Sequence, residues 1–260
     1  MEDSAIFNPR RAGRKMRVAA FMSGSGSNVR KILAMSQKSF EVVFIFSDVA
    51  DDAKCNGQKI AREYDLPFFT HDVRAYHQAR GLARSVKTKE GLAARRAYDR
   101  VAERLIKAFE VDVIALGGYM SFLTLTGAIN VHPADLSLVD ENGRRVFVGD
   151  DAVRDAIAAG RPELRSSTLF TDLAVDSGPL LMISEALPVE LPVPLAELKA
   201  DKALLRQVAD QHQERLKEAG DWVIFPQTLE LIASGRLGLS GDTVTLDGKP
   251  MPGGVRPGDV

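Results

Sequence analysis

Short apolar runs alternate with amphipathic stretches through the first half of the sequence. Residues 17–22, 41–47 and 111–116 are nearly continuous apolar runs and are predicted strands, with a shorter one at 66–69. Residues 29–35, 53–64 and 93–109 carry apolar side chains at helical spacing. Strands that are apolar on both faces and separated by helices are typical of parallel sheets with right-handed crossovers. The sequence therefore predicts an α/β fold.

The second half continues the pattern less regularly. We expect helices at 151–159, 195–218 and 221–233, strands at 166–170 and 180–184, and a terminal hairpin around Gly241-Asp242. We interpret residues 1–16 as a flexible N-terminal extension and 17–260 as a single catalytic domain. Within that domain, 71–92 is a polar, basic insertion and 247–260 is a C-terminal tail.

Charge and apolar content exclude several classes of protein. The chain has 260 residues, of which 27% are charged, and its net charge of −1 lacks the basic excess of a protein that binds nucleic acid through bulk charge. It has no run of about 20 apolar residues, so we expect no membrane span. The single cysteine, Cys55, excludes an internal disulfide and fits a reducing compartment, and we expect a cytoplasmic protein.

A polar pair ends one of the predicted strands. Asn130 and His132 are two positions apart, and alternate residues of a strand point to the same side. Pro133, which has no N–H for a ladder, ends the strand. Open α/β sheets place their chemistry at such strand ends. The pair alone is equally compatible with a catalytic histidine and with a histidine satisfied at a strand end.

A glycine loop joins the first strand to the first helix. Its sequence is Ser23-Gly24-Ser25-Gly26-Ser27-Asn28, and a helix N-terminus behind small residues can bind a phosphate or carboxylate through backbone N–H groups. It is not a P-loop, because no Gly-Lys-Ser/Thr follows, and Val29 stands where a dinucleotide fingerprint has its third glycine. A glycine turn that only starts the helix is an equally good interpretation.

These segments, taken together, resemble one known family. In order, they are Ser23 to Asn28, Gly117-Gly118-Tyr119-Met120, Asn130-Val131-His132-Pro133, Leu173 to Pro179 and Ser234-Gly235-Arg236-Leu237. The chain resembles the 10-formyltetrahydrofolate-dependent formyltransferases, and among them the phosphoribosylglycinamide (GAR) formyltransferases most closely. The resemblance implies a Rossmann-like, mostly parallel twisted sheet with helices on both faces.

The resemblance also implies a site and a reaction. Its catalytic set falls on Asn130, His132 and Asp176; by itself, Asp176 is equally well explained as a turn residue before Ser-Gly-Pro. The resemblance assigns the substrate phosphate to Gly24, Ser25, Gly26, Ser27 and Asn28. It assigns the folate to Met120, Ser121, Phe122, Leu123, Thr171, Asp172, Leu173, Ala174 and Val175. The expected formyl donor is 10-formyltetrahydrofolate, and no metal is expected.

Departures from the family leave the acceptor open. Ser121 stands where the family has arginine, Leu169 where it commonly has histidine, and the segment 134–151 differs. We therefore expect a small, phosphorylated amine as partner, by default glycinamide ribonucleotide, with an amino sugar or modified nucleotide as alternatives. Hydrolysis of formyltetrahydrofolate, a catalytically silent relative and a nicotinamide-dependent dehydrogenase, with Asp48 on a ribose, are further alternatives. We expect neither nucleic acid nor membrane as partner, and a homodimer remains open.

Overall fold

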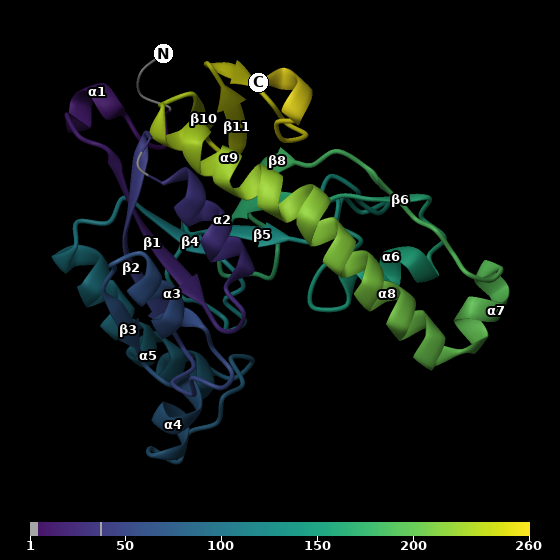
Figure 1. The fold of residues 1–260 in the computed structure, drawn as a ribbon, viewed down its shortest axis with the longest axis horizontal. Coiled ribbons are helices and arrows are strands. Elements are labelled where there is room, and N and C mark those ends of the chain that lie inside the picture. Colours follow the sequence, from purple (N-terminus) through teal and green to yellow (C-terminus); the bar gives the residue numbers. More distant parts are fainter. Residues whose placement is uncertain (1–4, 37) are drawn as a thin grey trace. The chain divides into compact units, whose positions relative to one another are not determined.

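The computed structural model describes residues 5–36 and 38–260, and its contacts divide the chain into two compact units. The N-terminal unit contains Phe7–Asn130 and Thr171–Leu173. The C-terminal unit contains Val131–Phe170 and Ala174–Val260, together with Ala5 and Ile6. Figure 1 labels most of the helices and strands of both units. The single domain predicted over 17–260 stays a prediction.

The N-terminal unit is built on parallel strands. In the sheet their order is β3-β2-β1-β4-β5, and each neighbouring pair is parallel. The strands are β1 (Met16–Met22), β2 (Phe40–Ser47), β3 (Phe68–Thr70), β4 (Val113–Leu116) and β5 (Ile129–His132). β1 lies between β2 and β4 and is buried at all but one of its positions. The predicted class, an α/β fold with a mostly parallel sheet, is confirmed.

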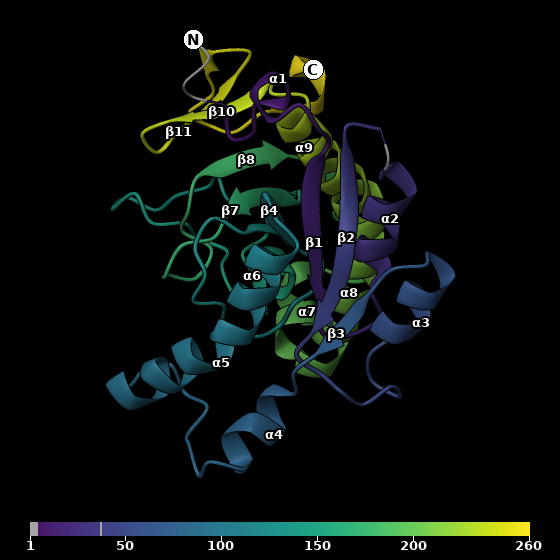
Figure 2. The same ribbon diagram turned by 90° about the vertical axis from the view of Figure 1, so that its left-hand side faces the viewer.

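Helices connect these strands. They are α1 (Pro9–Ala12), α2 (Ser27–Met35), α3 (Gly57–Glu63), α4 (Val73–Gln78) and α5 (Lys89–Ala108). Figure 2 shows α2 and α3 on one side of β1 and β2 and α5 on the other. The α5 helix begins at an N-cap, Thr88, whose hydroxyl accepts from the Gly91 N–H at 3.0 Å.

Aromatic side chains fill the core between the strands and α5. Phe21 of β1 packs against Phe46 of β2 with ring centroids 4.8 Å apart, and Tyr119 lies 5.5 Å from Phe21 in an edge-on geometry. Phe44 packs in the same way against Phe109, just beyond α5, at 5.0 Å. β1 leads directly into the predicted phosphate loop, and Tyr119 of this core directly precedes the predicted folate segment 120–123.

The C-terminal unit contains shorter elements. They are α6 (Ala152–Ala158), β6 (Glu163–Leu164), β7 (Ser167–Phe170), β8 (Leu180–Ile183), β9 (Leu187–Pro188), α7 (Leu195–Ala200), α8 (Lys202–Leu216), the π-helical segment η2 (Lys217–Asp221), α9 (Trp222–Ala233), β10 (Leu237–Ser240), β11 (Thr243–Leu246), β12 (Lys249–Pro250) and the 3-10 turn η3 (Pro257–Asp259). β7 and β8 are antiparallel. β10 and β11 form the predicted terminal hairpin. Figure 1 shows α8 and α9 in line, joined through η2.

Some element boundaries differ from the prediction. The helix predicted over 195–218 is two helices, because the Asp201 side chain accepts from the N–H groups of Ala203 and Leu204 and so starts α8 afresh. The insertion at 71–92 contains α4, which begins at the N-cap Asp72. In both places an aspartate side chain accepts from backbone N–H groups and so starts a helix.

The predicted N-terminal extension is described only in part, since residues 1–4 lie outside the described residues. Its remainder contains α1, which has Asn8 as N-cap and Pro9 at the first helical position. The Ile6 N–H donates to the Leu237 carbonyl at 3.2 Å. The flexibility of this extension stays a prediction. In the part of the chain that the structure describes, no helix is both long and apolar enough to cross a membrane.

Candidate active site

β5 carries two of the predicted catalytic residues. Asn130 is half-buried and lies opposite Leu116 of β4 in the parallel ladder. His132 ends the strand and is 5% exposed. Their spacing within one strand is the one that the sequence predicted. Asn130 is the last residue of the segment Phe7–Asn130 of the N-terminal unit, whereas His132 belongs to the C-terminal unit.

Within the C-terminal unit, Asp176 faces His132. The distance between His132 Nδ1 and Asp176 Oδ2 is 3.5 Å, and the two side chains are 7% and 10% exposed. Asp176 has a φ of +52°, a left-handed conformation that aspartate tolerates better than most side chains. The turn after β7 thus brings the carboxylate to the imidazole. Their catalytic roles stay predictions.

The segment that follows His132 closes around this pair. The carbonyl oxygen of Phe147 lies 3.2 Å from His132 Nε2, and the Gly149 N–H donates to Asp176 Oδ2 at 2.9 Å. Arg145 donates to the carbonyls of Asp176 and Gly178. Both ring nitrogens of His132 therefore face acceptor oxygens. Because a neutral imidazole has one N–H, only the protonated ring can donate to both at once.

The predicted phosphate loop joins β1 to α2. Gly26 has a φ of +71°, and a Cβ there would lie 2.4 Å from Ile60 Cδ1, so the position requires glycine. Gly24 has open space around it. Its carbonyl accepts from the Asn56 N–H at 3.0 Å, which fixes the loop against the start of α3. The loop places small residues before a helix N-terminus, as an anion site requires; anion binding here stays a prediction.

A buried carboxylate lies between this loop and the segment after β4. Asp48, at the end of β2, is 3% exposed and accepts hydrogen bonds from the hydroxyls of Ser23 and Ser121. The Ser23 hydroxyl also accepts from the Met120 N–H at 2.9 Å. Both oxygens of Asp48 are thus occupied within the protein. An aspartate turned inward in this way does not fit the ribose-binding acid of the dehydrogenase alternative.

The predicted folate segment 120–123 is held from α5 by a buried ion pair. Arg95 Nε and Asp99 Oδ1 are 3.3 Å apart, with side chains 4% and 1% exposed. Arg95 donates to the Tyr119 hydroxyl at 3.0 Å, and Asp99 accepts from both the N–H and the hydroxyl of Thr124. Burial raises the pKa of Asp99, although Arg95 and Thr124 oppose it. Sequence reasoning missed this pair, whose i,i+4 spacing on a helix was the available signal.

Several predicted folate residues expose apolar surface. Met120 and Leu173 of the N-terminal unit are 70% and 53% exposed, and Val175 of the C-terminal unit is 61% exposed. Phe122 is half-buried, whereas Leu123 is buried in the aromatic core and can offer a ligand only its backbone. The other predicted residues are half-buried or exposed: Ser121, Thr171, Asp172 and Ala174. Exposed apolar side chains on a loop are typical of a surface that a ligand covers.

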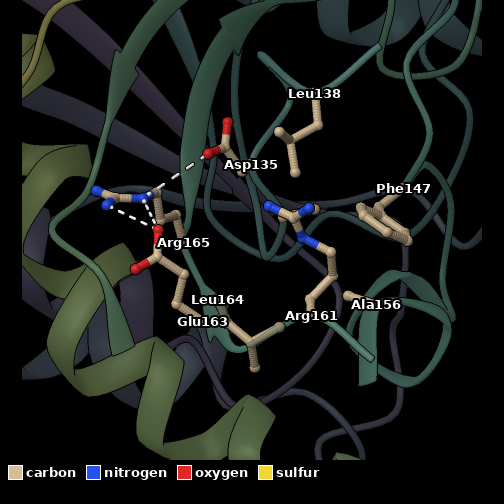
Figure 3. A pocket seen from close by; sticks show the side chains of 9 residues that line it. Asp135, Leu138, Phe147, Ala156, Arg161, Glu163, Leu164 and Arg165 are labelled. Atoms are coloured by element: carbon tan, nitrogen blue, oxygen red, sulfur yellow. Dashed lines mark hydrogen bonds and ion pairs between the residues drawn. The ribbon is translucent and has the colours of Figure 1, made fainter. Parts of the chain in front are cut away.

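A small cavity of the C-terminal unit adjoins Phe147. Figure 3 shows Phe147, Leu138 and Ala156 with the guanidinium groups of Arg161 and Arg165. The cavity is small, with a volume of about 10 Å³, which is room for about one water molecule. Arg165 forms ion pairs with Glu163 at 3.0 Å and Asp135 at 3.8 Å. Neither His132 nor Asp176 lines it, so this cavity is distinct from the predicted catalytic pair.

No group of three His, Cys, Asp or Glu side chains suited to a metal ion is found in residues 5–36 and 38–260. The one cysteine, Cys55, is buried, and its sulfur lies 3.2 Å from the Ser47 hydroxyl.

Comparisons with known proteins find one matching family model and several similar proteins. The family model described as formyl transferase matches residues 16–191. The trifunctional purine biosynthetic protein adenosine-3 of Gallus gallus is 25% identical over 228 residues, which are 85% of this chain and 19% of that protein. The chain spans a fifth or less of the first such relatives. Phosphoribosylglycinamide formyltransferase of Bacillus subtilis (strain 168) is 25% identical over 63% of this chain and 75% of its own length.

A solved structure has a similar fold. It is phosphoribosylglycinamide formyltransferase of Coxiella burnetii in complex with CHES, with a TM-score of 0.65 and 23% identity. The match covers 94% of this chain and 99% of that one. At this identity the likeness concerns the fold.

Proposed function

Because the chain belongs to the formyl transferase family, we propose that it transfers a formyl group from 10-formyltetrahydrofolate to the amine of glycinamide ribonucleotide. The observation that carries the proposal is the His132–Asp176 pair at the end of β5, two positions after Asn130. The relatives named as phosphoribosylglycinamide formyltransferases support this acceptor. This reaction belongs to purine biosynthesis.

The residues suit each step of formyl transfer. The substrate amine attacks the formyl carbon, a C–N bond forms and an oxyanion develops on the formyl oxygen. The Asn130 amide donates to that oxygen, and so does a protonated His132, whose Nε2–H must exchange the Phe147 carbonyl for the formyl oxygen when the substrate binds. Donors of this kind contribute about 2.7–4 kcal/mol each. The bond from the carbon to N10 of the folate then breaks, as a proton leaves the amine and reaches N10. His132 is the group that carries this proton, since imidazole titrates nearest neutrality.

Asp176 has a positioning role in this scheme. Its carboxylate holds Nδ1 of His132 and stabilises the ring's positive charge. The Gly149 N–H and the Arg145 guanidinium in turn hold Asp176 in place. The folate carries an already activated formyl group, so the chemistry asked of the protein is orientation, oxyanion stabilisation and proton transfer.

A direct assay tests the proposal. The protein is incubated with 10-formyltetrahydrofolate, with and without glycinamide ribonucleotide, and appearance of tetrahydrofolate is followed. We expect turnover that depends on the acceptor, and its loss in His132→Ala. Turnover without acceptor would instead identify a hydrolase. Turnover only with an amino sugar or modified nucleotide would identify a different acceptor, and a fully active His132→Ala would refute the site.

The proposal extends to the cellular location, the partners and the oligomeric state of the enzyme. We propose a cytoplasmic location, since the only cysteine is free and buried, and partners limited to small molecules. A homodimer is the oligomeric form to test, by sedimentation of the purified chain. Nucleic acid and membrane are not proposed as partners.

A further inference from the structure

Asp48 connects two segments that the proposed function assigns to different substrates. Ser23 is the first residue of the glycine loop, whose residues 24–28 would bind the ribonucleotide phosphate, and Ser121 lies in the segment that would bind the pterin. Asp48 accepts from the Ser23 hydroxyl through Oδ1 at 2.5 Å and from the Ser121 hydroxyl through Oδ2. One buried carboxylate thus holds both segments.

Two further hydrogen bonds join the segments directly. The Ser23 N–H donates to the Gly118 carbonyl at 3.0 Å, and the Met120 N–H donates to the Ser23 hydroxyl at 2.9 Å. The Ser23 side chain therefore donates to Asp48 and accepts from Met120 at the same time. A shift of Ser23 at the start of the glycine loop would displace the backbone of Met120.

The carboxylate determines the direction of these bonds. An ionised aspartate only accepts, so both serine hydroxyls must turn their protons toward it. This leaves a lone pair of Ser23 Oγ free for the Met120 N–H. Asp48 forms no ion pair with any described residue, although it is 3% exposed. A buried carboxylate without a cation is costly unless hydrogen bonds satisfy it, and here its hydrogen-bond donors are the two hydroxyls.

We propose that Asp48 is a positioning residue that couples the two substrate sites, so that each substrate binds more tightly once the other is bound. The mechanism is the chain of bonds from the glycine loop through Ser23 and Asp48 to Ser121 and Met120. Occupation of either segment restricts this chain and lowers the ordering cost for the other. The inference rests on the proposed function, because it takes the glycine loop and the 120–123 segment as the two substrate sites.

The coupling is measurable as a ratio of affinities. Titration calorimetry gives the Kd of glycinamide ribonucleotide with and without saturating tetrahydrofolate, a pair that cannot react. We expect the folate to tighten this Kd about tenfold in the wild type, within the usual range of coupling between sites. Ser121→Ala and Ser23→Ala should reduce the ratio to less than twofold. Ser121→Thr, which keeps the hydroxyl, should restore it.

A matched control removes a similar bond elsewhere. Ser166 donates to the buried carboxylate of Asp221 at 2.5 Å in the C-terminal unit. Ser166→Ala should cost stability as Ser121→Ala does, and should leave the coupling ratio at the wild-type value. A wild-type ratio near one, or an unchanged ratio in both Ser121→Ala and Ser23→Ala, would overturn the inference.

A second measurement separates this inference from the proposed function. If glycinamide ribonucleotide does not bind the wild type, the proposed acceptor is wrong. Hydrogen exchange then tests the coupling with tetrahydrofolate alone. We expect the folate to slow exchange of the amides at 24–28 in the wild type and in Ser121→Thr, with no such effect in Ser121→Ala. An identical response in all three proteins, or none in the wild type, would overturn the inference.

Discussion

Nδ1 of His132 lies 3.5 Å from Oδ2 of Asp176, and both side chains are about nine-tenths buried. The carboxylate also accepts from the Gly149 N–H, so its orientation is fixed independently of the ring. Only the protonated imidazole can donate both to this carboxylate and to the Phe147 carbonyl on its other side. The proposed proton transfer assigns that proton to His132.

Asp176→Asn should therefore lower kcat about 100-fold or more, in the range of general acid–base contributions. The variant keeps the size of the side chain and removes the charge that faces His132. The measurement is kcat for tetrahydrofolate release at saturating substrates, with circular dichroism to verify the fold. Asp247→Asn is the matched control, because Asp247 also has a left-handed backbone, with a φ of +50°, and an ion pair with Arg236. Equal kcat values for the two variants would contradict the role of Asp176.

Two glycines of the glycine loop, Gly24 and Gly26, should respond differently to substitution by alanine. Gly26→Ala should destabilise the protein by about 1–3 kcal/mol, because it forces a side chain into a left-handed conformation and toward Ile60 and Met22. Gly24→Ala has no atom within 4 Å of the new Cβ, so its Tm should stay near the wild-type value. Thermal denaturation checks both.

Gly24→Ala also tests the phosphate assignment. If a phosphate approaches this backbone closely, the added methyl group should raise the KM for the phosphorylated acceptor several-fold and leave the KM for the folate unchanged. An unchanged acceptor KM would place the phosphate elsewhere.

The buried Arg95–Asp99 pair should contribute strongly to stability. Asp99→Ala leaves Arg95 buried without its counter-charge and frees the N–H of Thr124, so we expect a loss of about 3–5 kcal/mol. Urea denaturation measures the free energy of unfolding. Glu103→Ala, which removes the exposed pair with Lys107 on the same helix, should change it by less than about 1 kcal/mol. Similar losses of unfolding free energy in the two variants would show that the buried pair stabilises the protein no more than the exposed pair does.

The lowered pKa of His71 predicts that the stability of the protein depends on pH. Burial lowers its pKa, Arg80 and Arg95 add to the effect, and Asp72 and Asp99 oppose it. The unfolded chain therefore takes up the proton first as the pH falls below about 6.5, so stability is full above that pH and decreases below it.

His71→Phe removes this titration. The ring can remain stacked on Tyr98, where the centroids are 4.5 Å apart. The free energy of unfolding of the variant should fall less steeply than that of the wild type between about pH 6.5 and pH 5. Parallel pH curves for the two proteins would refute the contribution of His71.

The order of strands and helices was predictable because the signals are local. Continuous apolar runs correctly marked β1, β2 and β4, and the spacing of Asn130 and His132 placed both on β5. The boundaries of the helices were harder to predict from the sequence. Asp201 divides the long helix before α8, and Asp72 starts α4, because side-chain caps compete with the helical pattern.

The sequence by itself determined the α/β class, since strand and helix periodicities are properties of neighbouring residues. The candidate residues came from the resemblance of its motifs to one family. The family model then confirmed the resemblance. Only the tertiary structure decided what each polar group faces. It turned Asp48 inward onto Ser23 and Ser121 and brought Asp176 to His132. The physical reason is that a buried polar group must find its partner in space, and these partners come from distant parts of the chain.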